Sequence, residues 1–167
     1  MALAKNTILN HKTIEHKIKR IAYQIYESNV NEKDLVIAGI ESNGYLLAKK
    51  IKANLDKISE IKSTLCRVTI DKNNPTTPVL TSMNQKDYAN KSIVLIDDVL
   101  NSGSTLIYGI KHFLDVPLKQ FKTAVLVNRN HKKYPVKADF KGISLSTSLY
   151  EHVNVNLSKK PYEAYLD

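Results

Sequence analysis

Two adjacent carboxylates follow an aliphatic run in the stretch SIVLIDDVLNSGSTL, residues 92–106. Asp97 and Asp98 come directly after Ser92 to Ile96, a run with the length and composition of a buried strand. Ligands of open parallel sheets bind beyond the carboxyl ends of the strands, which is where these two acids are expected. A carboxylate can accept hydrogen bonds from vicinal hydroxyls or face a magnesium ion, and the sequence leaves both chemistries open.

The residues after the acids form a loop of small hydrogen-bond donors, Asn101-Ser102-Gly103-Ser104-Thr105. A helical pattern follows, and the first backbone N–H groups of a helix have no internal acceptor. Hydroxyl groups and a glycine that permits close approach make this loop suitable for cradling a phosphate. Acids that bind two neighbouring hydroxyl groups, beside a loop that binds a phosphate, are what a ribose 5-phosphate requires. The alternative is an ordinary strand end followed by a capped helix, where Asp and Ser are common.

Strands and helices alternate along the part of the chain that would position these groups. Runs of strand length predict strands at 35–40, 64–70, 92–96 and 121–127, and helical spacing predicts helices at 11–28, 46–55 and 103–114. This order predicts an α/β fold, with a parallel twisted sheet flanked by helices. The terminal segments, including the short strands expected in ADFKGISL and VNVNL, would pack around the sheet as a small hood.

Residues 71–91 interrupt this alternation with a polar sequence, DKNNPTTPVLTSMNQKDYANK, which carries two prolines. The composition predicts a long loop, and long loops in compact domains often act as lids over a site. No linker or repeat divides the 167 residues, so residues 1–167 are expected to form one domain.

Composition bounds the class of protein and its partners. Hydrophobic residues make up 43% of the chain, which excludes a disordered protein, and no apolar run approaches the ~20 residues of a membrane span. No membrane partner is therefore expected. The single cysteine, Cys66, cannot form an internal disulfide, so a reducing, cytoplasmic location is expected. The net charge of +9 favours anionic partners, either phosphorylated small molecules or nucleic acid, unless it reflects only a lysine-rich surface.

The stretch VLIDDVLNSGST resembles the phosphoribosyl pyrophosphate (PRPP) signature of type I phosphoribosyltransferases. It has that signature's order of aliphatic strand, two acids, two largely apolar residues and a hydroxyl-Gly-x-Thr loop. Three other segments resemble the pyrimidine-operon attenuators that are also uracil phosphoribosyltransferases: ILNHKTIEHKIKRIAYQI, DLVIAGIESNGYLLAKKI and AVLVNRNHKKYPVKADFKGISLSTSLYEHVNVNL. The resemblance covers roughly residues 8–157 and implies the type I phosphoribosyltransferase fold and a homodimer or larger homo-oligomer.

The resemblance implies that PRPP and a nucleobase, with uracil favoured, give a nucleoside monophosphate and pyrophosphate in the presence of Mg²⁺. Asp97 and Asp98 would hold the ribose 2- and 3-hydroxyls and could also meet the metal, while Arg67 would lie at the base of a loop that closes over the reaction. These three are the expected catalytic residues. The remaining expected ligands are Asn101, Ser102, Gly103, Ser104 and Thr105 for the 5-phosphate, Glu41, Ser42, Asn43 and Gly44 for pyrophosphate, and Asn128, Phe140 and Lys141 for the base.

Three positions depart from the pattern of these relatives. Their pyrophosphate loop usually carries Lys or Arg, whereas residues 41–44 read ESNG here. Ser104 stands where uracil-specific relatives tend to have Arg, and residues 128–130 read NRN in place of Asp-Arg-Gly. A carboxylate about 4 Å from a phosphate charge costs about 1 kcal/mol even in water, so Glu41 is expected to oppose pyrophosphate binding. Backbone N–H groups of the loop could still hold the anion.

Two other functions fit the same sequence. The first is an RNA-binding regulator, because a basic stretch with interleaved aromatics follows the strand at 121–127. Lysines that neutralise phosphates and aromatics that stack on bases are what RNA binding needs, although a solvated loop beside the base site would look the same. The charged residues of this stretch are Arg129, His131, Lys132, Lys133 and Lys137. The second is a non-catalytic sensor of PRPP or a nucleotide, which the acidic loop at 41–44 would permit.

Overall fold

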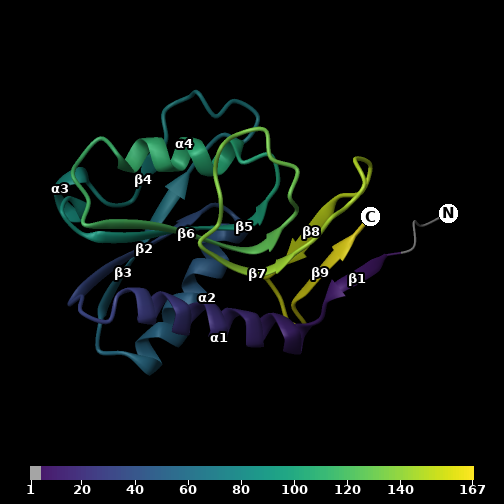
Figure 1. Cartoon of the computed structure of the whole chain (residues 1–167), viewed down its shortest axis with the longest axis horizontal. Coiled ribbons are helices and arrows are strands. Elements are labelled where there is room, and N and C mark those ends of the chain that lie inside the picture. Colours follow the sequence, from purple (N-terminus) through teal and green to yellow (C-terminus); the bar gives the residue numbers. More distant parts are fainter. Residues whose placement is uncertain (1–4) are drawn as a thin grey trace.

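The computed structural model describes residues 5–167 and is built around a six-stranded sheet (Figure 1). Its strands are β2 (Asp34–Ile40), β3 (Lys62–Thr69), β4 (Leu80–Thr81), β5 (Ser92–Leu100), β6 (Gln120–Asn128) and β7 (Phe140–Ser144). Their order across the sheet is β4-β3-β2-β5-β6-β7, and every neighbouring pair is parallel except β3 and β4. The predicted α/β fold with a parallel sheet is confirmed.

Helices cover both faces of this sheet (Figure 1). On one face lie α1 (His11–Ser28) and α2 (Asn43–Ile58), and on the other lie α4 (Ser104–Phe113) and the short α3 (Gln85–Tyr88). Because β2, β5 and β6 are covered on both sides, they are apolar on both faces, which explains their continuous apolar runs. None of the helices in residues 5–167 combines the length and the apolar character needed to cross a bilayer.

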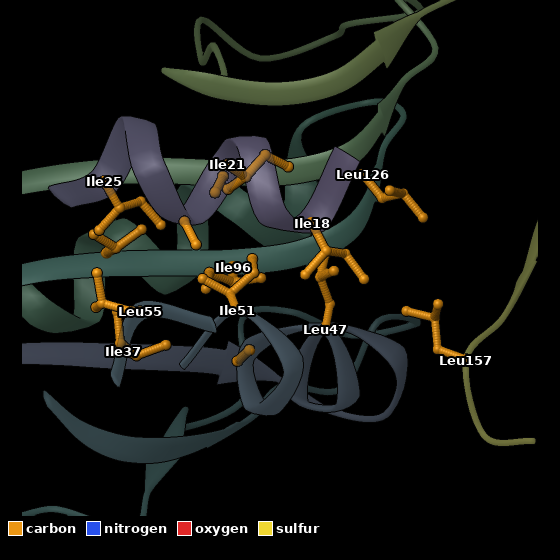
Figure 2. Close-up of a cluster of buried hydrophobic side chains, with 14 of the residues drawn as sticks. Ile18, Ile21, Ile25, Ile37, Leu47, Ile51, Leu55, Ile96, Leu126 and Leu157 are labelled. Carbon is orange, nitrogen blue, oxygen red and sulfur yellow. The ribbon is translucent and has the colours of Figure 1, made fainter. Parts of the chain in front are cut away.

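Helix α1 begins where the sequence predicts. The Asn10 side chain caps it by accepting a hydrogen bond from the backbone N–H of Thr13 at 2.9 Å. Isoleucines spaced at helical intervals then face the sheet and α2, where they form one hydrophobic cluster (Figure 2). The labelled members from α1 are Ile18, Ile21 and Ile25.

The two ends of the chain pair in a second, antiparallel sheet. β1 (Asn6–Leu9) pairs with β9 (Glu163–Leu166), which also pairs with β8 (Val153–Asn156). The Thr7 hydroxyl donates to a carboxylate oxygen of Glu163 at 2.9 Å across this sheet. This sheet is the small hood expected from the terminal segments, and it contains the strand expected in VNVNL. The strand expected in ADFKGISL does not join it, because β7 pairs with β6 at the edge of the main sheet. The sequence did not predict β1 and β9, because four residues are too few to show a period.

The middle of the chain differs from the sequence-based expectation in two respects. β5 continues through the two acids to Leu100, which pairs with Asn128, so the acids lie inside a strand and not beyond its end. The segment 71–91 is not one polar loop, because it contains β4 and α3 and because Tyr88 is completely buried. The longest stretch of this segment without helix or strand is 71–79, which restricts the expected lid to that part.

The buried Tyr88 ring lies edge-on to Phe113, with ring centroids 5.0 Å apart, while its hydroxyl has no hydrogen-bond partner in the described part of the chain. An unpaired buried hydroxyl destabilises a protein by about 1–3 kcal/mol. We therefore expect Tyr88→Phe to leave the free energy of unfolding unchanged or raise it by about 1 kcal/mol in urea titrations. Tyr88→Ala, the matched change that removes the ring, should lower it by about 3–5 kcal/mol. A Tyr88→Phe variant less stable than the parent by more than 1 kcal/mol would show that the hydroxyl is satisfied.

Candidate active site

A cleft of about 360 Å³ opens at the carboxyl end of β5. Lys72 contributes to its wall from the loop after β3, Val125 from β6 and Val153 from the hood. The other lining residues are Asp97, Asp98, Val99, Leu100, Asn101, Ser102, Gly103, Ser104, Thr105 and Leu106. The structure thus brings all the residues expected to bind ribose and 5-phosphate to one cleft.

The two acids have different environments. Asp97 is only 4% exposed, and its carboxylate accepts a hydrogen bond from the backbone N–H of Asp98 at 2.9 Å. Burial, followed by the negative charge of Asp98, raises the pKa of Asp97 well above its ordinary value of 3.8. The Lys72 ammonium, 3.8 Å from the Asp97 carboxylate, acts in the opposite direction. Asp98 is partly exposed and accepts from the backbone N–H of Val99 at 2.9 Å.

Asn43 links the acid pair to the hood. Its side-chain amide donates to Asp98 Oδ2 at 3.2 Å and to the backbone carbonyl of Val155 in β8 at 2.9 Å. The sequence placed Asn43 in the pyrophosphate loop, and the structure gives its side chain these two partners. Gly44, next in the chain, lets α2 approach β5, since a Cβ there would lie 2.8 Å from the Ile96 carbonyl oxygen.

The predicted phosphate cradle leads directly into α4. Gly103 has φ of +87°, a left-handed conformation that favours glycine, and Ser104 begins the ten-residue helix. The backbone N–H of Ser104 donates to the Ser102 hydroxyl at 3.2 Å. A Cβ on Gly103 would lie 2.5 Å from a methyl group of Val136, so the loop after β6 closes one side of the cradle. The free N–H groups of the first helical turn suit a phosphate.

Glu41 has two partners in the structure, although it belongs to the loop predicted to bind pyrophosphate. One of its carboxylate oxygens lies 3.1 Å from Nε of Arg67, and the other accepts a hydrogen bond from the Thr69 hydroxyl at 3.1 Å. The Arg67 guanidinium also lies over the Tyr45 ring, 4.5 Å from its centroid. The structure therefore places the predicted catalytic Arg67 beside the acid expected to oppose pyrophosphate. Ser42 is exposed in the turn between Glu41 and α2.

The three residues expected to bind the base do not line the cleft, and neither do Arg67 and the loop at 41–44. The Asn128 side chain accepts a hydrogen bond from the backbone N–H of Asn130 at 3.2 Å, and Phe140 packs against the hydrophobic cluster under α1. The Lys141 carbonyl accepts from Arg20 at 3.1 Å and so is already engaged. Strand register nevertheless places Lys141 level with the acids, two strands away, which corresponds to roughly 10 Å.

Arg129 requires a correction, because its predicted role in RNA binding needs an exposed side chain. It is only 5% exposed, and its guanidinium donates to the Thr147 hydroxyl at 2.7 Å, to Asn101 Oδ1 at 3.1 Å and to the Ser148 carbonyl at 3.0 Å. His131 is likewise engaged, with Nε2 2.8 Å from the Thr147 carbonyl oxygen. Arg129 thus joins the cradle to the loop before the hood and does not form part of a surface.

Comparison with known proteins agrees with this geometry. The family model described as phosphoribosyl transferase domain matches residues 5–158. The chain belongs to the phosphoribosyl transferase family. It is 32% identical to the bifunctional protein PyrR of Macrococcus caseolyticus over 164 residues, which cover 93% of each chain, and 32% identical to that of Clostridium kluyveri over 162 residues, covering 93% and 92%. The predicted family and enzyme class, a phosphoribosyltransferase, are confirmed.

Solved structures show the same fold at low sequence identity. A hypoxanthine-guanine phosphoribosyltransferase from Bacillus anthracis superposes with a TM-score of 0.81 at 17% identity, over 98% of both chains. A hypoxanthine phosphoribosyltransferase from Staphylococcus aureus gives 0.72 at 17% identity, over 86% of this chain and 79% of that one. The predicted type I phosphoribosyltransferase fold is confirmed.

Outside the stretch 92–106, sequence reasoning missed three residues that line the cleft of this phosphoribosyltransferase, namely Lys72, Val125 and Val153. Val125 faces the same side of the sheet as α4, because successive side chains of a strand point to opposite faces. This alternation could have been read from the sequence of β6. Lys72 and Val153 come from a loop and from the hood, and no local pattern relates either to the acids. Only the folded arrangement shows that a lysine lies close to Asp97.

The raised pKa of Asp97 should make the free energy of unfolding depend on pH. At pH values between 3.8 and the raised folded-state pKa, the folded protein binds a proton at Asp97 that the unfolded chain releases. This stabilisation is complete below 3.8 and is lost as pH rises through the folded-state pKa. Asp97→Asn should therefore raise the free energy of unfolding at pH 8 by about 1–2 kcal/mol relative to the parent, and by less at pH 5. Urea titrations at both pH values measure this, with the exposed Asp34→Asn as control. Equal differences at pH 5 and pH 8 would contradict it.

Proposed function

We propose that this phosphoribosyltransferase transfers the phosphoribosyl group of PRPP to uracil, and that residues 1–167 form one transferase domain. The observation that carries the proposal is the shared cleft, in which the acid pair and the cradle at 101–105 meet. Asp97 and Asp98 would accept hydrogen bonds from the ribose hydroxyls, and Gly103 with the start of α4 would bind the 5-phosphate. Uracil is preferred because the closing segment resembles uracil-specific relatives.

The reaction breaks the bond between ribose C1 and a pyrophosphate oxygen and forms a bond from C1 to a base nitrogen, which loses its proton. The protein's part is to orient the two substrates and to keep water away from C1. Residues 71–79 are the segment suited to exclude water, since Lys72 from this loop already reaches Asp97.

Magnesium fits the oxygen donors of the cleft, because carboxylates and phosphate oxygens are its preferred ligands. Among residues 5–167, no group of three or more His, Cys, Asp or Glu side chains forms a metal site of protein ligands alone. We therefore propose that Mg²⁺ enters with PRPP and that Asp97 and Asp98 complete its surroundings. When bound, the ion neutralises charge on the departing pyrophosphate.

Pyrophosphate release tests the proposal. The protein is incubated with PRPP, Mg²⁺ and, in turn, uracil, xanthine, guanine, hypoxanthine and orotate, and we expect release with uracil. Asp98→Asn and Gly103→Val should each abolish PRPP binding, the first by removing a charged acceptor and the second by placing a side chain where φ is +87° and Val136 is in contact. Release with another base would reassign the substrate. Binding of PRPP without release under any base would favour the sensor.

RNA binding is a second candidate function, and one specific observation favours it. Lys132, Lys133 and Lys137 are exposed on the loop after β6, together with the 38%-exposed Tyr134. Helix α1, which carries the exposed Lys19, contacts the next strand along the chain, because Arg20 donates to the Gly142 carbonyl of β7 at 2.8 Å. Exposed lysines with a stacking aromatic suit an RNA backbone and its unpaired bases.

Charge reversal tests this second function. Lys132→Glu with Lys133→Glu should weaken binding to pyrimidine-operon leader RNA and reduce the slope of log affinity against log salt by about two. Lys62→Glu with Lys86→Glu makes the same change in net charge on exposed residues of β3 and α3 and should have little effect. Absence of measurable RNA binding by the parent protein would remove this function. The cytoplasmic location and the homo-oligomer stay predictions.

A further inference from the structure

The pairing of Glu41 with Arg67 carries an inference about how the transferase binds pyrophosphate, and it rests on the proposed PRPP site. Both carboxylate oxygens of Glu41 are engaged, one by Arg67 Nε and the other by the Thr69 hydroxyl, each at 3.1 Å. The Arg67 side chain is 53% exposed, and Nε is one of its five N–H donors. The guanidinium therefore retains N–H groups that can bind a second anion.

The order of chemical groups in PRPP indicates which part of it would reach Glu41 and Arg67. In PRPP the two ring hydroxyls lie between the pyrophosphate on C1 and the phosphate on C5. The acid pair is likewise flanked, by the cradle at 101–105 and by the loop at 41–44. That loop touches both acids: Asn43 donates to Asp98 at 3.2 Å, and a Cβ on Gly44 would lie 2.9 Å from Asp97 Cα. With the 5-phosphate in the cradle, the pyrophosphate points to Glu41 and Arg67.

We propose that Arg67 is the side-chain ligand of the pyrophosphate and that Glu41 is an internal anion that competes with the pyrophosphate for Arg67. In the free protein, Glu41 pairs with the guanidinium, which lies over Tyr45, and the Thr69 hydroxyl donates to Glu41. When PRPP binds, the guanidinium is shared between the carboxylate and the pyrophosphate, so the pyrophosphate gains only part of its charge and of its N–H groups. Glu41 thereby weakens PRPP binding and favours release of the pyrophosphate product.

A double-mutant cycle distinguishes competition for Arg67 from simple repulsion. Dissociation constants for Mg²⁺–PRPP and for inorganic pyrophosphate are measured by calorimetry at low ionic strength, where exposed charges are least screened. Glu41→Gln keeps the shape and hydrogen bonding of the side chain and removes its charge, so we expect binding of both ligands to tighten roughly two- to fivefold. Arg67→Gln should weaken both, and the double variant should match Arg67→Gln within a factor of two.

Glu32→Gln is the matched control, because Glu32 forms a 2.8 Å ion pair with Lys119 and precedes the amino end of β2, whereas Glu41 follows the carboxyl end. It should leave both dissociation constants unchanged. Arg67→Lys, which keeps the charge without the planar fork, should bind pyrophosphate more weakly than the parent and provides a second variant if Arg67→Gln does not fold.

Three results would overturn the inference. The gain from Glu41→Gln could persist at full size without Arg67, which would mean that Glu41 only repels the ligand. Arg67→Gln could bind pyrophosphate as well as the parent does, or Glu41→Gln could bind no better. Failure of the proposed transfer is a separate outcome, since PRPP that binds but releases no pyrophosphate leaves the cycle intact. A parent protein that binds no PRPP would overturn both proposals.

Discussion

Burial of the central strand β5 is the constraint on which the site depends. Its residues from Ser92 to Asp97 are buried between two helical layers, so the strand carries a carboxylate into a position that is only 4% exposed. A buried charge is tolerated only where hydrogen bonds and opposite charges compensate for lost hydration. The backbone N–H of Asp98 and the ammonium of Lys72 provide part of that compensation here. The same burial that raises the pKa of Asp97 also fixes the acid pair in one geometry.

Charges around the cleft are balanced locally, although the whole chain carries a net charge of +9. Glu41 pairs with Arg67, and Asp97 lies near Lys72, so groups suited to PRPP are already matched with internal partners of opposite charge. A ligand that enters must replace these contacts, and its net affinity is the difference between two sets of interactions. The net charge alone therefore indicates an anionic partner without indicating how strongly this cleft attracts one.

The segment after β6 connects the proposed functions physically. Buried Arg129 ties Asn101 of the cradle to the loop that precedes the hood, and the backbone N–H of Lys133 donates to the Ser102 carbonyl at 2.8 Å. The lysines that suit RNA thus lie on the loop that closes one side of the phosphate cradle. The phosphate cradle and the lysine-bearing loop therefore belong to one hydrogen-bonded unit, although they come from separate segments of the sequence.

The sequence by itself determined the long strands and helices and the character of the proposed PRPP site. Apolar runs and helical spacing predicted the long strands and helices, and the order of acids, glycine and hydroxyl residues predicted the cradle, because these signals are local and periodic. Only the tertiary structure decided that Glu41 meets Arg67, that Arg129 is buried, that Tyr88 anchors part of the expected loop, and that Phe140 and Lys141 lie outside the cleft. These facts depend on the register of neighbouring strands and on contacts between segments distant in the chain. No local pattern encodes them, because side chains from separate elements meet only after the sheet has formed.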